Sequence, residues 1–280
     1  MEMPRAKRSA PLLAVLCVVA LVGCGGDNPE DAGLNGGPPT LPGAESMIVG
    51  LAAFEDGGAA KSPVPIAAPA DSSNFVAARL AVAAINTAVI GFAAAPVAAF
   101  SAAIGTTPVQ QPDGSWDWSY SMTFDTLSLN LVLNGRADAQ GTHWAMRVTT
   151  TGLPADVSDF LWYTGEATLD GDVGNWQFYD ITAPETPTDL ARVDWSIDDA
   201  DTRWLYWVNN RQGGEHLGDG VTYSVDASAA SVTHLDASAL TSVVVAWDLV
   251  TTSGSLTAPG YNGGAEACWQ ENHLNTDCAP

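Results

Sequence analysis

The sequence predicts a mainly β fold: an antiparallel meander or a curved barrel-like sheet of about ten strands, with an Ala-rich helix or broken helix packed against it. Apolar and polar residues alternate with a period of two over several segments after residue 115. Clusters of Gly, Asn and Asp separate these segments at hairpin spacing. No long helical pattern lies between them, and this excludes the crossover helices of a parallel sheet.

The alternating segments share an aromatic or branched residue at every second position. They include Trp116–Phe124, Leu127–Leu133, Trp144–Val148, Val193–Ile197, Val221–Val225 and Val243–Leu249. Two further segments, 160–163 and 204–207, are apolar at consecutive positions and are predicted to bury both faces. Turns are expected at Asn134-Gly135, Gln140-Gly141, 170–175, 198–201 and 218–220.

An Ala-rich stretch without charge from Leu80 to Gln111 precedes the strands. Pro96 is expected to divide it into helices over 76–93 and 96–104, because proline lacks the N–H that a helix interior needs. Its length alone would also permit a transmembrane helix. The polar Asn86 and Thr87 favour a helix buried against the sheet instead.

The charge of the chain limits its partners. Ten Lys and Arg against 32 Asp and Glu give a net charge of −22, so nucleic-acid binding is not expected. Only 15% of residues are charged and 46% are hydrophobic, whereas a disordered acidic chain is depleted in apolar residues. The sequence therefore predicts a folded acidic protein.

The N-terminus carries an export signal. Arg5, Lys7 and Arg8 precede an apolar run that ends in Leu21-Val22-Gly23-Cys24. This ending resembles the lipobox of bacterial lipoproteins, which implies removal of residues 1–23 and acylation of Cys24. The resemblance implies a lipid-anchored protein of the bacterial cell envelope, and Gly rather than Asp at position 25 favours the outer membrane. An ordinary signal peptide with a chance cysteine is the alternative.

Three regions follow from these features. Residues 1–23 are the signal peptide, and 24–70 form a flexible Gly/Pro/Ala-rich tether behind the lipidated cysteine. Residues 71–280 form one α+β domain, helical over 75–104 and a β-meander over 115–270. The region ends in a loop between Cys268 and Cys278, a pair that predicts a disulfide in an exported chain, with about 2–3 kcal/mol of stabilisation. A metal site with His273 is the alternative, but its ligand set is incomplete.

No catalytic, metal or cofactor motif is found: GxSxG, P-loop, GxGxxG and HExxH are all missing from the sequence. The acidic segments 170–175 and 198–201 offer oxygen ligands of the kind that Ca²⁺ prefers. Asp and Asn also make hairpin turns for backbone reasons, and the spacing does not fit an EF-hand. No catalytic residue, metal or cofactor is therefore predicted, and the protein is not expected to be an enzyme.

Aromatic strand residues are the candidates for ligand binding, as a stacking surface or the lining of an apolar cavity; a Trp-rich core is the other interpretation. The candidates are Trp162, Trp176, Trp204 and Trp207. In the order of its elements, the region 75–280 is similar to lipocalin-like proteins and to outer-membrane lipoprotein carrier proteins, without a shared motif. That resemblance implies a non-catalytic protein that binds a hydrophobic small molecule or lipid. The alternatives are a surface-display or structural interaction protein, or a secreted polysaccharide hydrolase or sugar-binding protein.

Overall fold

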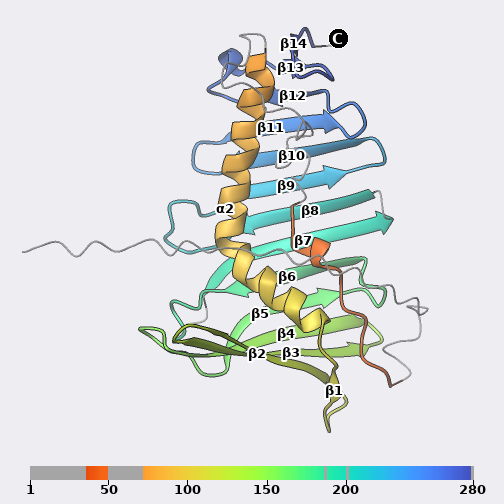
Figure 1. The fold of residues 1–280 in the computed structure, drawn as a ribbon, viewed down its shortest axis with the longest axis vertical. Helices are drawn as coiled ribbons and strands as arrows, with labels where there is room; N and C mark the ends of the chain where they lie inside the picture. The colour runs from red at the N-terminus through yellow and green to blue at the C-terminus, as the bar shows by residue number, and fades with distance from the viewer. Residues whose placement is uncertain (1–35, 50–71, 186–187, 200–201, 279–280) are drawn as a thin grey trace, which may run out of the picture.

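The computed structural model describes residues 36–49, 72–185, 188–199 and 202–278. In these residues fourteen strands form one antiparallel sheet, and a long helix, α2, crosses one of its faces (Figure 1). Each strand pairs with the next one in the sequence, from β1 at one edge to β14 at the other. The mainly β meander is thus confirmed, and the sheet is open rather than closed into a barrel.

The elements are numbered in chain order. The helical ones are η2 (Ala44–Ser46), α2 (Ser73–Ile104) and η4 (Asn262–Gly264). The first seven strands are β1 (Val109–Gln110), β2 (Trp116–Phe124), β3 (Leu127–Asp138), β4 (Gly141–Thr151), β5 (Phe160–Ala167), β6 (Val173–Tyr179) and β7 (Asp189–Asp199). The remaining seven are β8 (Thr202–Asn209), β9 (Gly220–Val225), β10 (Ala229–Asp236), β11 (Thr241–Asp248), β12 (Gly254–Thr257), β13 (Ala267–Trp269) and β14 (Asn275–Thr276).

The two faces of the sheet differ as the alternation predicts. In β4, for example, Trp144, Met146 and Val148 are buried on the face that α2 crosses, which we call the helix side. The side chains between them are half-buried or exposed. Seven of the ten tryptophans are buried on this helix side and form the centre of the core. They are Trp118, Trp144, Trp176, Trp195, Trp207, Trp247 and Trp269.

Several of these indole rings lie over a glycine of the neighbouring strand. Gly165 is directly opposite Trp176, and a Cβ at Gly165 would lie 2.2 Å from the Trp176 ring. Gly135 is opposite Trp144 in the same way, and a Cβ there would lie 2.3 Å from the ring. An aromatic ring that covers a cross-strand glycine replaces the contacts that the glycine cannot make.

This packing corrects the expected turn at Asn134-Gly135, which lies within β3. Asn-Gly is a strong hairpin signal. Here, however, Gly135 is needed to make room for Trp144, a requirement that only the pairing of β3 with β4 reveals. The strand count also exceeds the expected ten, partly because the edge strands β1 and β14 contain only two residues each.

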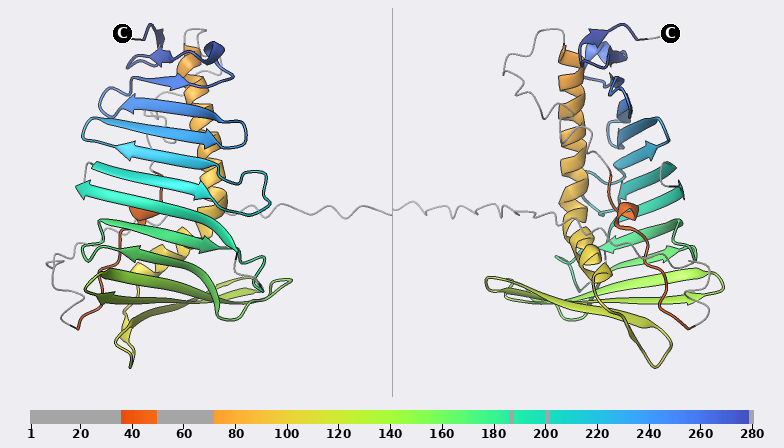
Figure 2. Two further views of the ribbon diagram at one scale, coloured as in Figure 1. Left: turned by 180° about the vertical axis from the view of Figure 1, so that it is seen from behind. Right: turned by 45° about the vertical axis from the view of Figure 1, so that its right-hand side comes forward.

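α2 is one continuous helix of 32 residues and not two helices separated at Pro96. It nevertheless changes direction in its C-terminal part, which contains Pro96 (Figures 1 and 2). Proline removes one helical hydrogen bond and clashes with the carbonyl four residues earlier, so a kink is the usual result. None of the helices in the described ranges is both long and apolar enough to cross a membrane.

Residues 36–49, which fall within the predicted tether, pack on the helix side of the sheet (Figure 2). Met47 is fully buried, and the Trp176 Nε1–H donates to Ser46 Oγ at 3.1 Å. The folded domain therefore begins before residue 71, because this segment packs on Trp176 together with Phe100 of α2. Residues 1–35, with the signal peptide and Cys24, lie outside the described residues.

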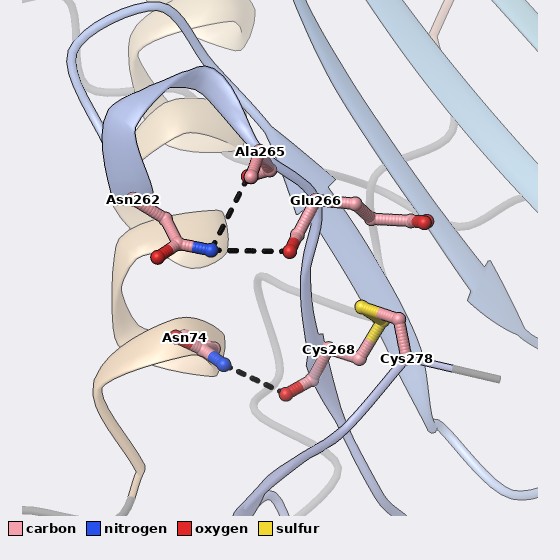
Figure 3. Close-up of a disulfide and its surroundings, with 6 residues drawn as sticks. All are labelled: Asn74, Asn262, Ala265, Glu266, Cys268 and Cys278. Atoms are coloured by element: carbon pink, nitrogen blue, oxygen red, sulfur yellow. Dashed lines mark hydrogen bonds between the residues drawn. A yellow bond between two sulfur atoms is a disulfide. The ribbon is translucent and has the colours of Figure 1, made fainter. Parts of the chain in front are cut away.

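The C-terminal segment holds the N-terminal end of α2 against the sheet (Figure 3). Cys268 and Cys278 form a disulfide, and Asn74 Nδ2 donates to the Cys268 carbonyl at 2.8 Å. The Tyr261 hydroxyl donates to Asn74 Oδ1 at 2.7 Å, and the Phe75 ring stacks on His273 at 3.8 Å. We call this set of contacts the C-terminal clasp.

Gly165→Ala is expected to lower the free energy of unfolding by about 1–3 kcal/mol, because the new Cβ must displace the fully buried Trp176 ring. Denaturant titration measures the change. The matched control is Gly260→Ala, where a Cβ meets nothing within 4 Å. The control should change stability by about 0.5 kcal/mol or less. Equal effects of both substitutions would show that the ring over Gly165 does not constrain the fold.

Asn74→Ala is expected to cost about 1–3 kcal/mol of stability, because it leaves the Cys268 carbonyl and the Tyr261 hydroxyl without their partner. Thermal unfolding measures the loss. Asn272→Ala in the disulfide loop is the control, since exposed Asn272 accepts only the local Leu274 N–H and should cost about 1 kcal/mol or less. A smaller loss for Asn74→Ala than for the control would contradict the role of the clasp.

Candidate functional site

A cavity of about 510 Å³ lies between the N-terminal half of α2 and strands β7–β11. Ala81, Ala84, Ile85 and Val89 of α2 form one wall. The opposite wall is the helix side of the sheet, which α2 crosses at this level (Figure 1). Pockets of 300–1,000 Å³ with mainly apolar walls are typical of small-molecule sites.

The space exists because α2 packs closely on the sheet at its two ends. Its N-terminal end packs on β11–β14 and its C-terminal end on β2 and β3. Between these contacts the helix presents small residues, among them Ala81 and Ala84, to β8–β10. Alanine side chains do not reach across to the sheet, so a cavity remains under the middle of the helix.

The floor of the cavity consists of two rows of side chains that run across the strands. Trp207, Val221, His234 and Val243 lie directly opposite one another on β8, β9, β10 and β11. Two residues further along, at the ends of these strands, the positions are polar: Asn209, Asp219 and Asp236. The cavity is therefore mostly apolar inside and polar at the strand ends. We call this polar end, with Asn209, Asp219 and Asp236, the polar mouth.

His216 and Asp219 form a pair at the polar mouth, on the loop between β8 and β9. His216 Nδ1 lies 3.0 Å from Asp219 Oδ2, and Asp219 Oδ1 accepts the Ala237 N–H at 2.9 Å. The His216 side chain is 68% exposed, whereas that of Asp219 is 13% exposed. The partly buried carboxylate is thus fixed by the β10–β11 turn, and the imidazole beside it is mostly exposed to solvent.

Asp236 is the second carboxylate of the polar mouth. Its Oδ1 accepts hydrogen bonds from the Ala239 N–H and the Ser238 hydroxyl, both at 2.8 Å. These bonds, with a smaller contribution from His234, hold the pKa of Asp236 below its ordinary value. Asp236 is therefore ionised at neutral pH.

Trp207 forms part of the apolar floor. Its ring stacks on Phe178 at 5.3 Å and is 4% exposed. Its Nε1–H is buried and makes no hydrogen bond in the part of the chain that the structure describes. A buried donor without a partner is uncommon in a folded protein.

The structure places the four predicted ligand-binding tryptophans in different environments. Trp207 lines the cavity, whereas Trp176 is fully buried in the core beneath the segment 36–49. Trp204 lies on the opposite face of the sheet, 39% exposed and stacked with Tyr206. Trp162 is half-buried at a bulge in β5. The structure therefore does not bring these four residues together.

Asn209, His216, Asp219, His234 and Asp236 were not among the predicted site residues. One signal was available for two of them: His234 and Asp236 continue the apolar positions Ala230 and Val232 of an alternating strand. A polar residue in register with an apolar face is a candidate for a polar site. Asn209, His216 and Asp219 come from the end of β8 and the loop that follows it, and only the pairing of β8, β9 and β10 brings them beside His234 and Asp236.

Two alternatives remained open from the sequence: a metal site formed by the cysteine pair with His273, and oxygen ligands for Ca²⁺ in the acidic segments. The structure arranges these residues differently. Glu266 lies near the Cys268–Cys278 pair, and these three are the one group of potential metal ligands found in the described residues. His273 instead stacks on Phe75 and contacts Thr252 Oγ1 through Nε2 at 3.3 Å. In the acidic segment 170–175, Asp170 accepts hydrogen bonds from Thr168 and Asp172, as a turn residue does.

Comparison of the chain with known protein families, with curated proteins and with solved structures finds no match.

Proposed function

We propose that this protein is a non-catalytic lipoprotein of the bacterial cell envelope that binds an amphipathic small molecule under α2. The observation that carries the proposal is the cavity of about 510 Å³ with an apolar interior and a polar mouth. Burial of an apolar ligand body there releases about 25 cal/mol for each Å² removed from water. The polar mouth provides partners for a head group.

The lining supports binding rather than catalysis. Its described residues include His216, His234, Asp219 and Asp236, which can exchange protons. They include no hydroxyl, thiol or amine side chain beside the histidines, so the arrangement lacks the usual nucleophile of a triad.

The proposed location rests on the lipobox-like ending at Cys24. An acylated cysteine would anchor the protein in a membrane, with the outer membrane favoured by Gly25. The residues after Cys24 would then connect the anchor to the folded domain, which includes residues 36–49. The net charge of −22 is unfavourable for nucleic-acid partners.

A second candidate function is glycan recognition by the other face of the sheet. Trp204 and Tyr206 are stacked there at 6.2 Å with an interplanar angle of 18°. Exposed aromatic rings can stack on sugar rings. We rank this function second because the pair is a surface feature, whereas the cavity is enclosed on two sides by α2 and the sheet.

The full chain should incorporate radiolabelled palmitate when it is expressed in a bacterium that makes lipoproteins. Cys24→Ser should abolish the label, because no thiol remains for diacylglycerol transfer. Cys17→Ser is the matched control within the signal peptide and should leave the label unchanged. Label that persists in Cys24→Ser would exclude anchoring at this residue.

Val243→Phe is expected to weaken binding of the apolar dye N-phenyl-1-naphthylamine at least about tenfold, because the larger ring occupies the cavity floor. Dye fluorescence measures the affinity in a chain that begins at residue 25, so that neither the apolar signal segment nor an acyl group binds the dye. The matched control is Val244→Phe, whose side chain points to the opposite face of β11 and should not affect binding.

Native mass spectrometry of the same chain adds an independent test. A carried ligand would give an extra mass that disappears on organic extraction. If the parent chain binds no dye and carries no extra mass, the binding function is wrong. If Trp204→Ala abolishes dye binding and Val243→Phe does not, the outer face is the binding surface.

A further inference from the structure

The charged side chains that line the cavity are all acidic or imidazole groups. Asp219 and Asp236 supply two carboxylates at the polar mouth, and no lysine or arginine is found among the described lining residues. Arg211, in the loop between β8 and β9, is directed elsewhere and pairs with Asp180 at 3.0 Å. The polar mouth therefore has no fixed positive charge.

The carboxylates are held in place before any ligand arrives. Asp219 is fixed by the Ala237 N–H and lies against the exposed His216 ring, and Asp236 is fixed by the Ala239 N–H and the Ser238 hydroxyl. Because hydrogen bonds from a turn hold each aspartate, its side chain needs little reorganisation when a charged ligand binds. A carboxylate oxygen can accept further hydrogen bonds through its remaining lone pairs.

We propose that the ligand of this cavity is a small amphiphile with a cationic head, such as an alkylammonium compound. The proposal rests on the proposed binding function and adds the chemical class of the ligand. The cationic head lies at the polar mouth between Asp219 and Asp236, and the apolar body lies over Trp207, Val221 and Val243. The ring of Trp207 offers an additional apolar surface to the ligand body.

An anionic head is unfavourable at the same position. A carboxylate or phosphate there would lie beside two carboxylates in a partly desolvated site without a compensating arginine or lysine. The protein as a whole carries a net charge of −22, so its field also repels an anion and attracts a cation. Fatty acids and anionic phospholipids are thus disfavoured as ligands.

The test compares three probes with the same apolar chain: decyltrimethylammonium, 1-decanol and decanoate. Each displaces N-phenyl-1-naphthylamine from the chain that begins at residue 25, at about pH 8, above the range in which imidazole is ordinarily charged. We expect the ammonium probe to bind about tenfold more tightly than the alcohol, and decanoate more weakly than both.

The variant Asp219→Asn with Asp236→Asn removes both charges but keeps the side-chain oxygens that the turns require. It should bind all three probes with similar affinity. Asp226→Asn is the matched control, because Asp226 accepts the Ser228 and Ala229 N–H groups in the same way and does not line the cavity. The control should retain the tenfold preference.

The outcomes separate the two proposals. Equal affinity for the three heads, or tightest binding of decanoate, would overturn the cationic head and leave the binding function intact. A preference for the ammonium probe that persists in the double variant would place the head elsewhere and also overturn this inference. Failure of every probe and of the dye to bind would overturn the binding function itself.

Discussion

The packing of indole rings over glycines of neighbouring strands is the constraint on which the rest of the structure depends. Gly165 beneath Trp176 and Gly135 beneath Trp144 let large rings lie close to the sheet. Trp176 and Trp195 also stack at 5.3 Å with an interplanar angle of 21°. The rings form a dense apolar layer across the strands, and an Ala-rich helix can cross this layer because its own side chains are small.

Much of the architecture was predictable from the sequence, because the alternation of period two is a local property. The meander, the helix on its face and the Cys268–Cys278 pair all follow from residues that are close in the sequence. The structure differs from these expectations where a residue distant in the sequence determines the local conformation. Asn134-Gly135 is a turn by local rules, yet Trp144 on the next strand keeps it extended. The packing of residues 36–49 likewise depends on Trp176, far along the chain.

The candidate site was less predictable because its groups come from α2, five strands and a loop. The tryptophan-rich strands indicate ligand binding, but of the four predicted ligand-binding tryptophans only Trp207 lines the cavity. Only the register across β8–β11 shows that His234 is in one row with Trp207 and that Asp236 lies beyond it. Pairing between strands is a long-range property, and sequence periodicity constrains it only weakly.

The size of the cavity depends on the small side chains that α2 presents to the sheet. Empty apolar space forfeits dispersion contacts and destabilises a protein, in proportion to its volume. Larger side chains at Ala81 and Ala84 would fill the space, and leucine suits a helix nearly as well as alanine. The C-terminal clasp at one end of α2, and its packing on β2 and β3 at the other, hold the helix above this space. The contacts at the two ends of α2 and the small side chains between them therefore set the size of this space.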